Sequence, residues 1–139
     1  MSGPQPVMRS CRGCRKRQAR AGLLRLRPDD QVGLRLAGWD ARDLEVKGRG
    51  LYACPSAECL QRMLRPILRD RLLTMQRAGA LLDEARRLGR SRLDARREGL
   101  RRRLAGGTLC GTTSLEDDPR SREWTALIAR IDESLVETR

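Results

Sequence analysis

Four of the five cysteines form two pairs whose spacing suits a metal ion. Two residues separate Cys11 from Cys14, four separate Cys54 from Cys59, and Gly13 gives the first pair the backbone freedom for a sharp turn. Thiolates bind zinc tetrahedrally, and one such site can hold a small domain together. We therefore predict one structural Zn²⁺ bound by these four cysteines, with reduced free thiols as the alternative. Because four thiolates close the coordination sphere, a catalytic zinc is disfavoured.

A second chemistry open to the first cysteine pair is thiol redox. Reactive pairs of this spacing usually lie at the start of a helix that follows a strand, whereas Cys11 and Cys14 lie in a basic turn over residues 9–20. The chain has no histidine, which removes every Ser-His and Cys-His arrangement. We therefore predict a protein that is not an enzyme and keep a thiol-redox protein as an alternative.

The charge of the chain indicates a polyanionic partner. Its 139 residues include 30 Lys and Arg against 18 Asp and Glu, which gives a net charge of +12, and lysine occurs only at Lys16 and Lys47. Nucleic acid is the first partner to consider for such an excess, and an anionic membrane surface is the second. With no Phe, one Tyr and two Trp, the chain cannot form an RRM-like sheet of base-stacking aromatics. Binding is therefore expected through arginine–phosphate contacts.

The sequence predicts a cytoplasmic protein. No run approaches the roughly 20 apolar residues of a membrane span. Residues 1–10 lack the apolar core of a signal peptide. In a reducing compartment the cysteines are expected to be metal ligands or free thiols before disulfides.

The N-terminal half has the pattern of a small α+β domain. Residues 23–27 and 32–36 alternate around a Pro/Asp turn, which predicts a β-hairpin with arginines on its outer face, and residues 51–53 can add a third strand. Ser56 is a plausible N-cap for a helix with Cys59 in its first turn, where the dipole favours a thiolate. Pro66 suits the first turn of a second helix.

The C-terminal half is predicted to be helical. Residues 72–104 are arginine-rich, and three glycines at positions 79, 89 and 99 predict a bent helix or two shorter ones, with Leu82, Leu93 and Leu104 on one face. A last helix is expected to start at Asp118, and its apolar stripe must bury against the Leu82/Leu93 face, a second copy of the chain or a protein partner. The stripe consists of Trp124, Leu127, Ile128, Ile131 and Leu135.

Charge is divided along the chain. Residues 114–139 hold seven acidic and four basic residues, a net −3, which leaves +15 for residues 1–113. The last helix is therefore expected to pair with the arginine-rich helix and to compete there with RNA. The predicted organisation is a tail (1–8), an RNA-binding domain (9–70), an arginine-rich helical segment (71–105), a linker with Cys110 (106–117) and an amphipathic helix (118–139).

A glycine-flanked arginine precedes the second cysteine pair. Gly48-Arg49-Gly50 lets backbone amides and a guanidinium approach a phosphate together. We expect Arg49 to matter most among the RNA contacts.

The same residues resemble the bacterial YlxR family, small basic proteins to which RNA binding is ascribed and which are often encoded between a transcription elongation factor and translation initiation factor 2. The resemblance covers residues 9–70. It rests on Arg9, Cys11, Gly13 and Cys14, the run Leu23-Leu24-Arg25-Leu26, the box Gly48-Arg49-Gly50-Leu51-Tyr52-Ala53-Cys54-Pro55, and Cys59.

The resemblance implies an α+β fold, an antiparallel sheet with packed helices, and a role in RNA metabolism with ribonuclease P RNA as one target. Members often have Pro before the glycine-arginine-glycine box and Ala after it, where this chain has Lys47 and Leu51. The basic residues at and beside the motifs are the predicted RNA contacts: Arg9, Arg12, Arg25, Lys47, Arg49, Arg62, Arg65 and Arg69.

Two further functions stay open beside RNA binding and thiol redox. The same charge would serve a DNA-binding transcriptional regulator whose helix over residues 66–105 lies in a groove. The apolar stripe of the last helix would also serve a zinc-tied protein-interaction module. A preference for structured RNA over double-stranded DNA would favour the leading interpretation.

Overall fold

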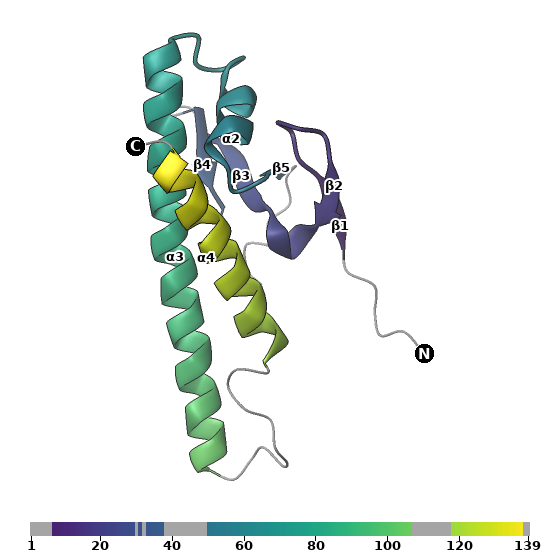
Figure 1. Ribbon diagram of the computed structural model, residues 1–139, viewed down its shortest axis with the longest axis vertical. Helices are drawn as coiled ribbons and strands as arrows, with labels where there is room; N and C mark the ends of the chain where they lie inside the picture. Colours follow the sequence, from purple (N-terminus) through teal and green to yellow (C-terminus); the bar gives the residue numbers. More distant parts are fainter. Residues whose placement is uncertain (1–6, 30, 32, 38–49, 107–117, 138–139) are drawn as a thin grey trace.

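The computed structural model describes residues 7–29, 31, 33–37, 50–106 and 118–137. Within them the fold is α+β, as predicted, with two small antiparallel sheets beside three α-helices (Figure 1). The first sheet pairs β1 (Met8–Ser10) with β2 (Arg17–Ala19), and a 3-10 turn, η1 (Arg20–Gly22), follows. The second sheet contains β3 (Leu24–Asp29), β4 (Gly33–Leu36) and β5 (Leu51–Ala53). The helices are α2 (Ala57–Leu64), α3 (Arg71–Ala105) and α4 (Pro119–Glu137).

The predicted hairpin is confirmed as β3 and β4, but its turn was misplaced, since Pro28 and Asp29 belong to β3 and pair with β4. The two strands pair antiparallel, with Leu26 opposite Leu36. β5 pairs antiparallel with the other edge of β3, so the strand order is β4-β3-β5. Alternation along β3 turns Leu24 and Leu26 to the same face, where both are fully buried beneath the helices.

Capping residues set the starts of α2 and α3. The cap of α2 was predicted from the sequence, and the cap of α3 was not. Ser56 caps α2 as predicted, because its Oγ accepts a hydrogen bond from the amide three residues on, at 3.1 Å. The prediction that a helix restarts at Pro66 is wrong, since residues 65–70 are not helical. α3 starts after Asp70, whose Oδ1 accepts a hydrogen bond from the amide of Leu72 at 2.8 Å.

The alternative of two shorter helices over residues 72–104 is also wrong, because α3 is one continuous helix of 35 residues. Gly89 lies where the two long helices approach closely, and a Cβ there would stand 3.2 Å from Cγ1 of Ile128. The other two glycines face open space within the described chain. Each glycine costs about 1 kcal/mol relative to alanine. Packing of the apolar face against α2 and α4 outweighs this cost.

The apolar stripe of α4 packs on α3, as the first of the three predicted arrangements required. Leu82 and Leu93 of α3 are buried in the same core cluster as this stripe. Leu104 is 39% exposed, because α4 begins beside Arg96 and the last turns of α3 extend past it (Figure 1). The stripe is therefore covered within this chain, and its use by a second copy or a protein partner stays a prediction. Its buried members are Trp124, Leu127, Ile128 and Ile131, with Leu135 packed at the margin.

Ion pairs join α4 and the residue before it to α3, as the opposite charges of these segments predicted. Arg86 Nε lies 2.5 Å from Oδ1 of Asp132. Arg96 donates two hydrogen bonds to the carboxylate of Asp118, at 2.9 and 3.1 Å. The Oδ2 of Asp118 also accepts a hydrogen bond from the amide of Ser121 at 3.0 Å, so Asp118 caps α4 as predicted. Competition of this pairing with RNA stays a prediction.

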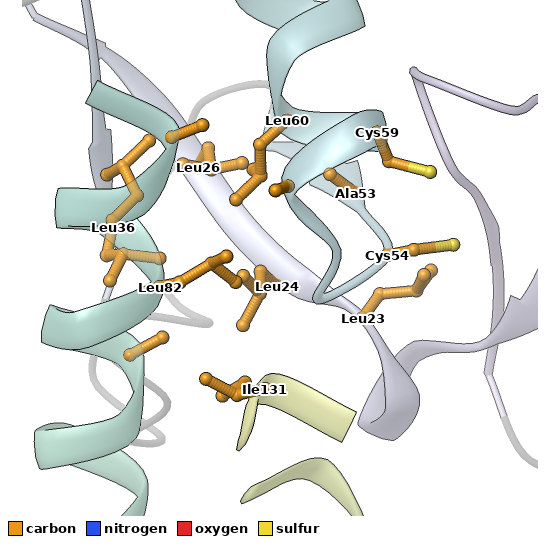
Figure 2. Packing of buried hydrophobic residues seen from close by; sticks show 14 of the residues in the cluster. Leu23, Leu24, Leu26, Leu36, Ala53, Cys54, Cys59, Leu60, Leu82 and Ile131 are labelled. Carbon is orange, nitrogen blue, oxygen red and sulfur yellow. The ribbon is translucent and has the colours of Figure 1, made fainter. Parts of the chain in front are cut away.

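A single apolar core joins the β3–β4–β5 sheet to all three α-helices. Five side chains at its centre, labelled in Figure 2, come from β3 and the three helices and are fully buried. Ser134 of α4 reinforces this junction, since its Oγ accepts a hydrogen bond from the amide of Ala57 at 2.7 Å, at the start of α2. The C-terminal helices therefore share the core of residues 9–70 and fix the elements that carry the cysteines. The five side chains at the centre of the core are Leu24 and Leu26 of β3, Leu60 of α2, Leu82 of α3 and Ile131 of α4.

Replacing Asp118 by alanine should lower the free energy of unfolding by about 2 kcal/mol at neutral pH, because a helix cap and an ion pair are removed together. The Arg96 guanidinium holds the pKa of this carboxyl well below its ordinary value, against the effect of burial. Such a group contributes fully above its unfolded pKa of about 3.9, and its contribution is lost as the pH falls. Denaturant unfolding should therefore show a smaller difference from wild type at pH 3 than at pH 7. If the variant and wild type differed equally in free energy of unfolding at the two pH values, the negative charge of Asp118 would have no role in stability.

Candidate metal centre and arginine-lined cavity

β1 and β2 hold the first cysteine pair in the turn between them. The sequence analysis expected only a basic turn over residues 9–20, because strands of three residues are too short to show a periodic pattern. The strands pair antiparallel with Arg9 opposite Gln18, and the amide of Cys11 donates to the carbonyl of Lys16 at 2.9 Å. The amide of Arg12 donates to a carbonyl of β5 at 2.8 Å, which ties this turn to the second sheet.

The four predicted cysteine ligands lie together. Their sulfur atoms are all within 4.8 Å of one another, and Sγ of Cys14 is 3.7 Å from Sγ of Cys54. A tetrahedral site with Zn–S bonds of about 2.3 Å has sulfur–sulfur edges of about 3.8 Å. The side chains of Cys54 and Cys59 point away from the leucine core toward the β1–β2 turn (Figure 2). The arrangement can hold a metal ion, and these four cysteines form no disulfide. Cys110 lies outside the described residues.

Hydrogen bonds from the surroundings fix the sulfur atoms. Sγ of Cys11 accepts from the amides of Gly13, Cys14 and Cys54 at 3.3, 3.4 and 3.2 Å. Nε2 of Gln18 donates to Sγ of Cys54 at 2.9 Å. Donors of this kind orient metal ligands from outside the coordination sphere. Gln18 was not predicted, since no pattern in the sequence marks a lone glutamine near a cysteine pair.

The thiols differ in acidity. Burial opposes ionisation of Cys11, but three backbone amides outweigh it and lower the pKa of that thiol to about 6. Burial, helped by the neighbouring charge of Cys11, raises the pKa of Cys59 to about 12 and also raises that of Cys54. The expectation that the helix start favours a Cys59 thiolate therefore does not hold for the thiols by themselves. A dication would offset the repulsion among several thiolates.

Gly13 sets the distance between the two cysteine pairs. A Cβ at this position would lie 2.5 Å from the carbonyl oxygen of Cys59 and 2.6 Å from its Cα, and both are backbone atoms. A side chain here would push the β1–β2 turn away from α2. The prediction that Gly13 provides backbone freedom for the turn is not supported, because Gly33 is the glycine with positive φ in the described chain. Glycine is needed at position 13 because of the close approach to α2.

Beside the cysteine cluster lies a cavity of about 560 Å³ with five arginines in its wall and no acidic residue among the described residues that line it. The arginines differ in depth. Arg25 is only 6% exposed, Arg20 is half-buried, and Arg9, Arg12 and Arg15 are exposed. The wall also contains β5, and the ring of Tyr52 there lies 5.9 Å from the guanidinium of Arg9. The cavity therefore presents a concentrated positive charge with one aromatic face.

The structure divides the predicted RNA contacts into groups. Arg9, Arg12 and Arg25 line this cavity. Arg25 lies on the outer face of β3, as predicted, but it is buried there, because Gly50 packs against its side chain. Lys47 and Arg49 lie outside the described residues.

The contacts predicted after Cys59 lie elsewhere. Arg62 is exposed and pairs with Glu58 at 2.6 Å, one turn away on α2. Arg65 and Arg69 line a second cavity of about 440 Å³ at the connection between α2 and α3. Arg15 and Arg20 belong to the first cavity but were missed. Their only signal in the sequence was their place in the basic segment around the first cysteine pair.

Comparisons of the chain with models of known protein families, with curated proteins and with solved structures find no match. The resemblance to the YlxR family therefore rests on the motif residues alone. Within the described residues, no helix combines the length and apolar character needed to span a bilayer.

Proposed function

We propose that this chain is a non-enzymatic RNA-binding protein of the YlxR type that acts in RNA metabolism. Its target would be a structured RNA, with ribonuclease P RNA and RNAs linked to transcription or translation as candidates. The observation that carries the proposal is the cavity in which five arginines converge without an acidic residue among the described lining. Guanidinium groups bind phosphate bidentately, and binding of this kind reads shape and backbone rather than base sequence.

The four cysteines would hold one structural Zn²⁺ in this proposal. Their sulfur spacing is compatible with a tetrahedral site, and four protein ligands leave no open position for catalysis. Cys11 supplies a ligand and also lines the cavity, and Arg12 and Arg15 lie in or directly after the same turn. The metal would therefore hold two arginines of the cavity wall in place. Thiol ligands stay reduced in the cytoplasm, where we propose that the protein acts.

A double variant at the cavity rim tests this function. Arg9 and Arg12 are exposed, so Arg9→Gln with Arg12→Gln should leave the fold intact while RNA affinity falls at least about tenfold at moderate salt. The slope of log K against log salt should become shallower by about 0.7 to 0.9 for each phosphate that the variant no longer neutralises. Filter binding with transcribed ribonuclease P RNA measures both quantities.

The matched control removes the same charge from the far end of α3. Arg101→Gln with Arg102→Gln changes two exposed arginines whose ion-pair partner is Glu98, and it should weaken RNA binding less than about threefold. Equal decreases in affinity for the two double variants would mean that net charge alone is measured. Tighter binding to double-stranded DNA of the same length would support the DNA-binding regulator instead.

A further inference from the structure

Two features of the cavity exceed what phosphate binding along an RNA strand requires. One is a guanidinium, that of Arg25, buried behind the exposed ones. The other is Arg15, whose backbone adopts a left-handed conformation with φ of 67°. We propose that the cavity binds the terminal phosphate of an RNA end, with the last base lying on Tyr52. This inference rests on the proposed RNA-binding function and specifies which part of the RNA the site takes.

The charge in the wall suits a phosphomonoester better than an internal phosphodiester. An internal phosphate carries one negative charge and is tethered on both sides. A terminal phosphate carries about −1.5 to −2 charge at neutral pH and presents three oxygens to donors. Five guanidiniums, each with a planar set of N–H donors, exceed what one diester can accept.

The depth of Arg25 favours the end of a chain. This residue is 6% exposed, whereas Arg9 and Arg12 are exposed at the rim. A phosphate can reach a charge at the base of such a site when the RNA strand continues from it on one side, as at a chain end. An internal phosphate is held back by the strand on both sides. Gly50 holds the base of the site in shape, because a Cβ there would stand 2.6 Å from Nε of Arg25. A dianion would also stabilise a cation that burial has partly removed from water.

Arg15 is kept in a conformation that glycine would adopt without strain. Left-handed backbone is unfavourable for residues with a Cβ. Within the described chain, Arg15 is the single non-glycine residue with positive φ. Its side chain lines the cavity, and the turn of Cys11 to Arg15 is closed by a hydrogen bond between their backbones at 2.8 Å. Strain at such a position is expected where the side chain has a function.

The cavity has room for a nucleotide as well as its phosphate. Its volume of about 560 Å³ falls within the range of small-molecule sites. Tyr52 provides an aromatic ring in the wall, and Arg9 lies 5.9 Å from the centre of that ring. Bases stack on such rings in single-stranded RNA complexes, and an arginine that lies over the ring, as Arg9 does, can join the stack.

Three RNA oligonucleotides of one sequence test the inference: one with a 5′-phosphate, one with a 3′-phosphate and one with hydroxyls at both ends. Fluorescence anisotropy at pH 7.5 should show at least about tenfold tighter binding of one phosphorylated form, which identifies the end. The advantage should shrink below about pH 6, where the phosphate gains a proton. Affinities within twofold for all three would overturn the inference alone. Failure of all three to bind at low salt would overturn the proposed function as well.

Arg15→Gly separates a binding role from a structural one. This variant should lose the preference for the phosphorylated end, while its melting temperature rises by about 2–4 °C because strain is relieved. Arg102→Gln, which removes an exposed arginine from the end of α3, should keep the full preference. Arg25→Gln should lose it too, and the same melting measurement shows whether that buried change leaves the fold intact. A full preference retained in Arg15→Gly, or its loss in Arg102→Gln, would overturn the inference.

Discussion

Cys54→Ser is expected to abolish zinc binding and to lower the free energy of unfolding by at least about 4 kcal/mol, because it removes one of the four ligands proposed for a structural metal. Sγ of Cys54 lies 3.7 Å from Sγ of Cys14 and accepts a hydrogen bond from Gln18 at 2.9 Å. Its amide donates to Sγ of Cys11. The residue therefore connects the end of β5 to the turn between β1 and β2, two parts of the chain that lie far apart in the sequence.

Metal analysis of the purified protein and thermal unfolding by circular dichroism measure the two effects. Wild type should contain about one Zn²⁺ per chain, and a chelator strong enough to remove it should lower the melting temperature to that of Cys54→Ser. Cys110→Ser is the matched control and should keep both metal and stability, because four thiolates already complete a tetrahedral site. A Cys54→Ser variant that retains one Zn²⁺ and its melting temperature would exclude the four-cysteine site.

The sequence predicted the features that neighbouring residues decide. Ser56 and Asp118 cap their helices through amides within the next turn. Leu24 and Leu26 alternate toward the core because strand geometry requires it. The cysteine cluster was also predictable despite the long separation of its halves. Thiol chemistry offers few other uses for two such pairs in a chain without histidine.

The features that the sequence did not reveal depend on distant contacts. Arg25 lies on the face of β3 that alternation predicts, but the approach of Gly50, just before β5, decides that it is buried. The continuity of α3 depends on α4, which packs against Gly89 through Ile128. Pro66 is a plausible helix start by itself, yet Asp70 provides a carboxylate that caps the helix from farther along the chain.

Those long-range contacts also explain why the cavity was only partly foreseen. Arginines near the motifs were predictable from the sequence, but their meeting in one wall was not. That wall forms only when the β1–β2 turn meets β5, and the hydrogen bond from the amide of Arg12 to the carbonyl of Tyr52 fixes this meeting. The cysteine cluster and the cavity are thus two faces of one junction. A change that opens the junction should affect both.

Gly13→Ala is the smallest such change, and it should destabilise the protein by at least about 2 kcal/mol and weaken zinc binding. The new methyl carbon would stand 2.5 Å and 2.6 Å from two backbone atoms of Cys59, so the clash cannot be relieved by rotating a side chain. Either the β1–β2 turn, which contains Cys11 and Cys14, or the start of α2, which contains Cys59, must move, so cysteine ligands are displaced in both cases. Competition for zinc with a chromogenic chelator and denaturant unfolding measure the two effects.

Gly79→Ala makes the same chemical change where the chain has room. A Cβ at Gly79 would meet no atom of the described chain within 4 Å, and the residue lies within α3. Alanine favours helix over glycine by up to about 1 kcal/mol, so this variant should be more stable than wild type and bind zinc equally well. The two substitutions therefore predict opposite signs for the change in stability. If Gly13→Ala also proved neutral or stabilising, the close approach of the β1–β2 turn to α2 would be wrong, and with it the geometry of both the metal centre and the cavity.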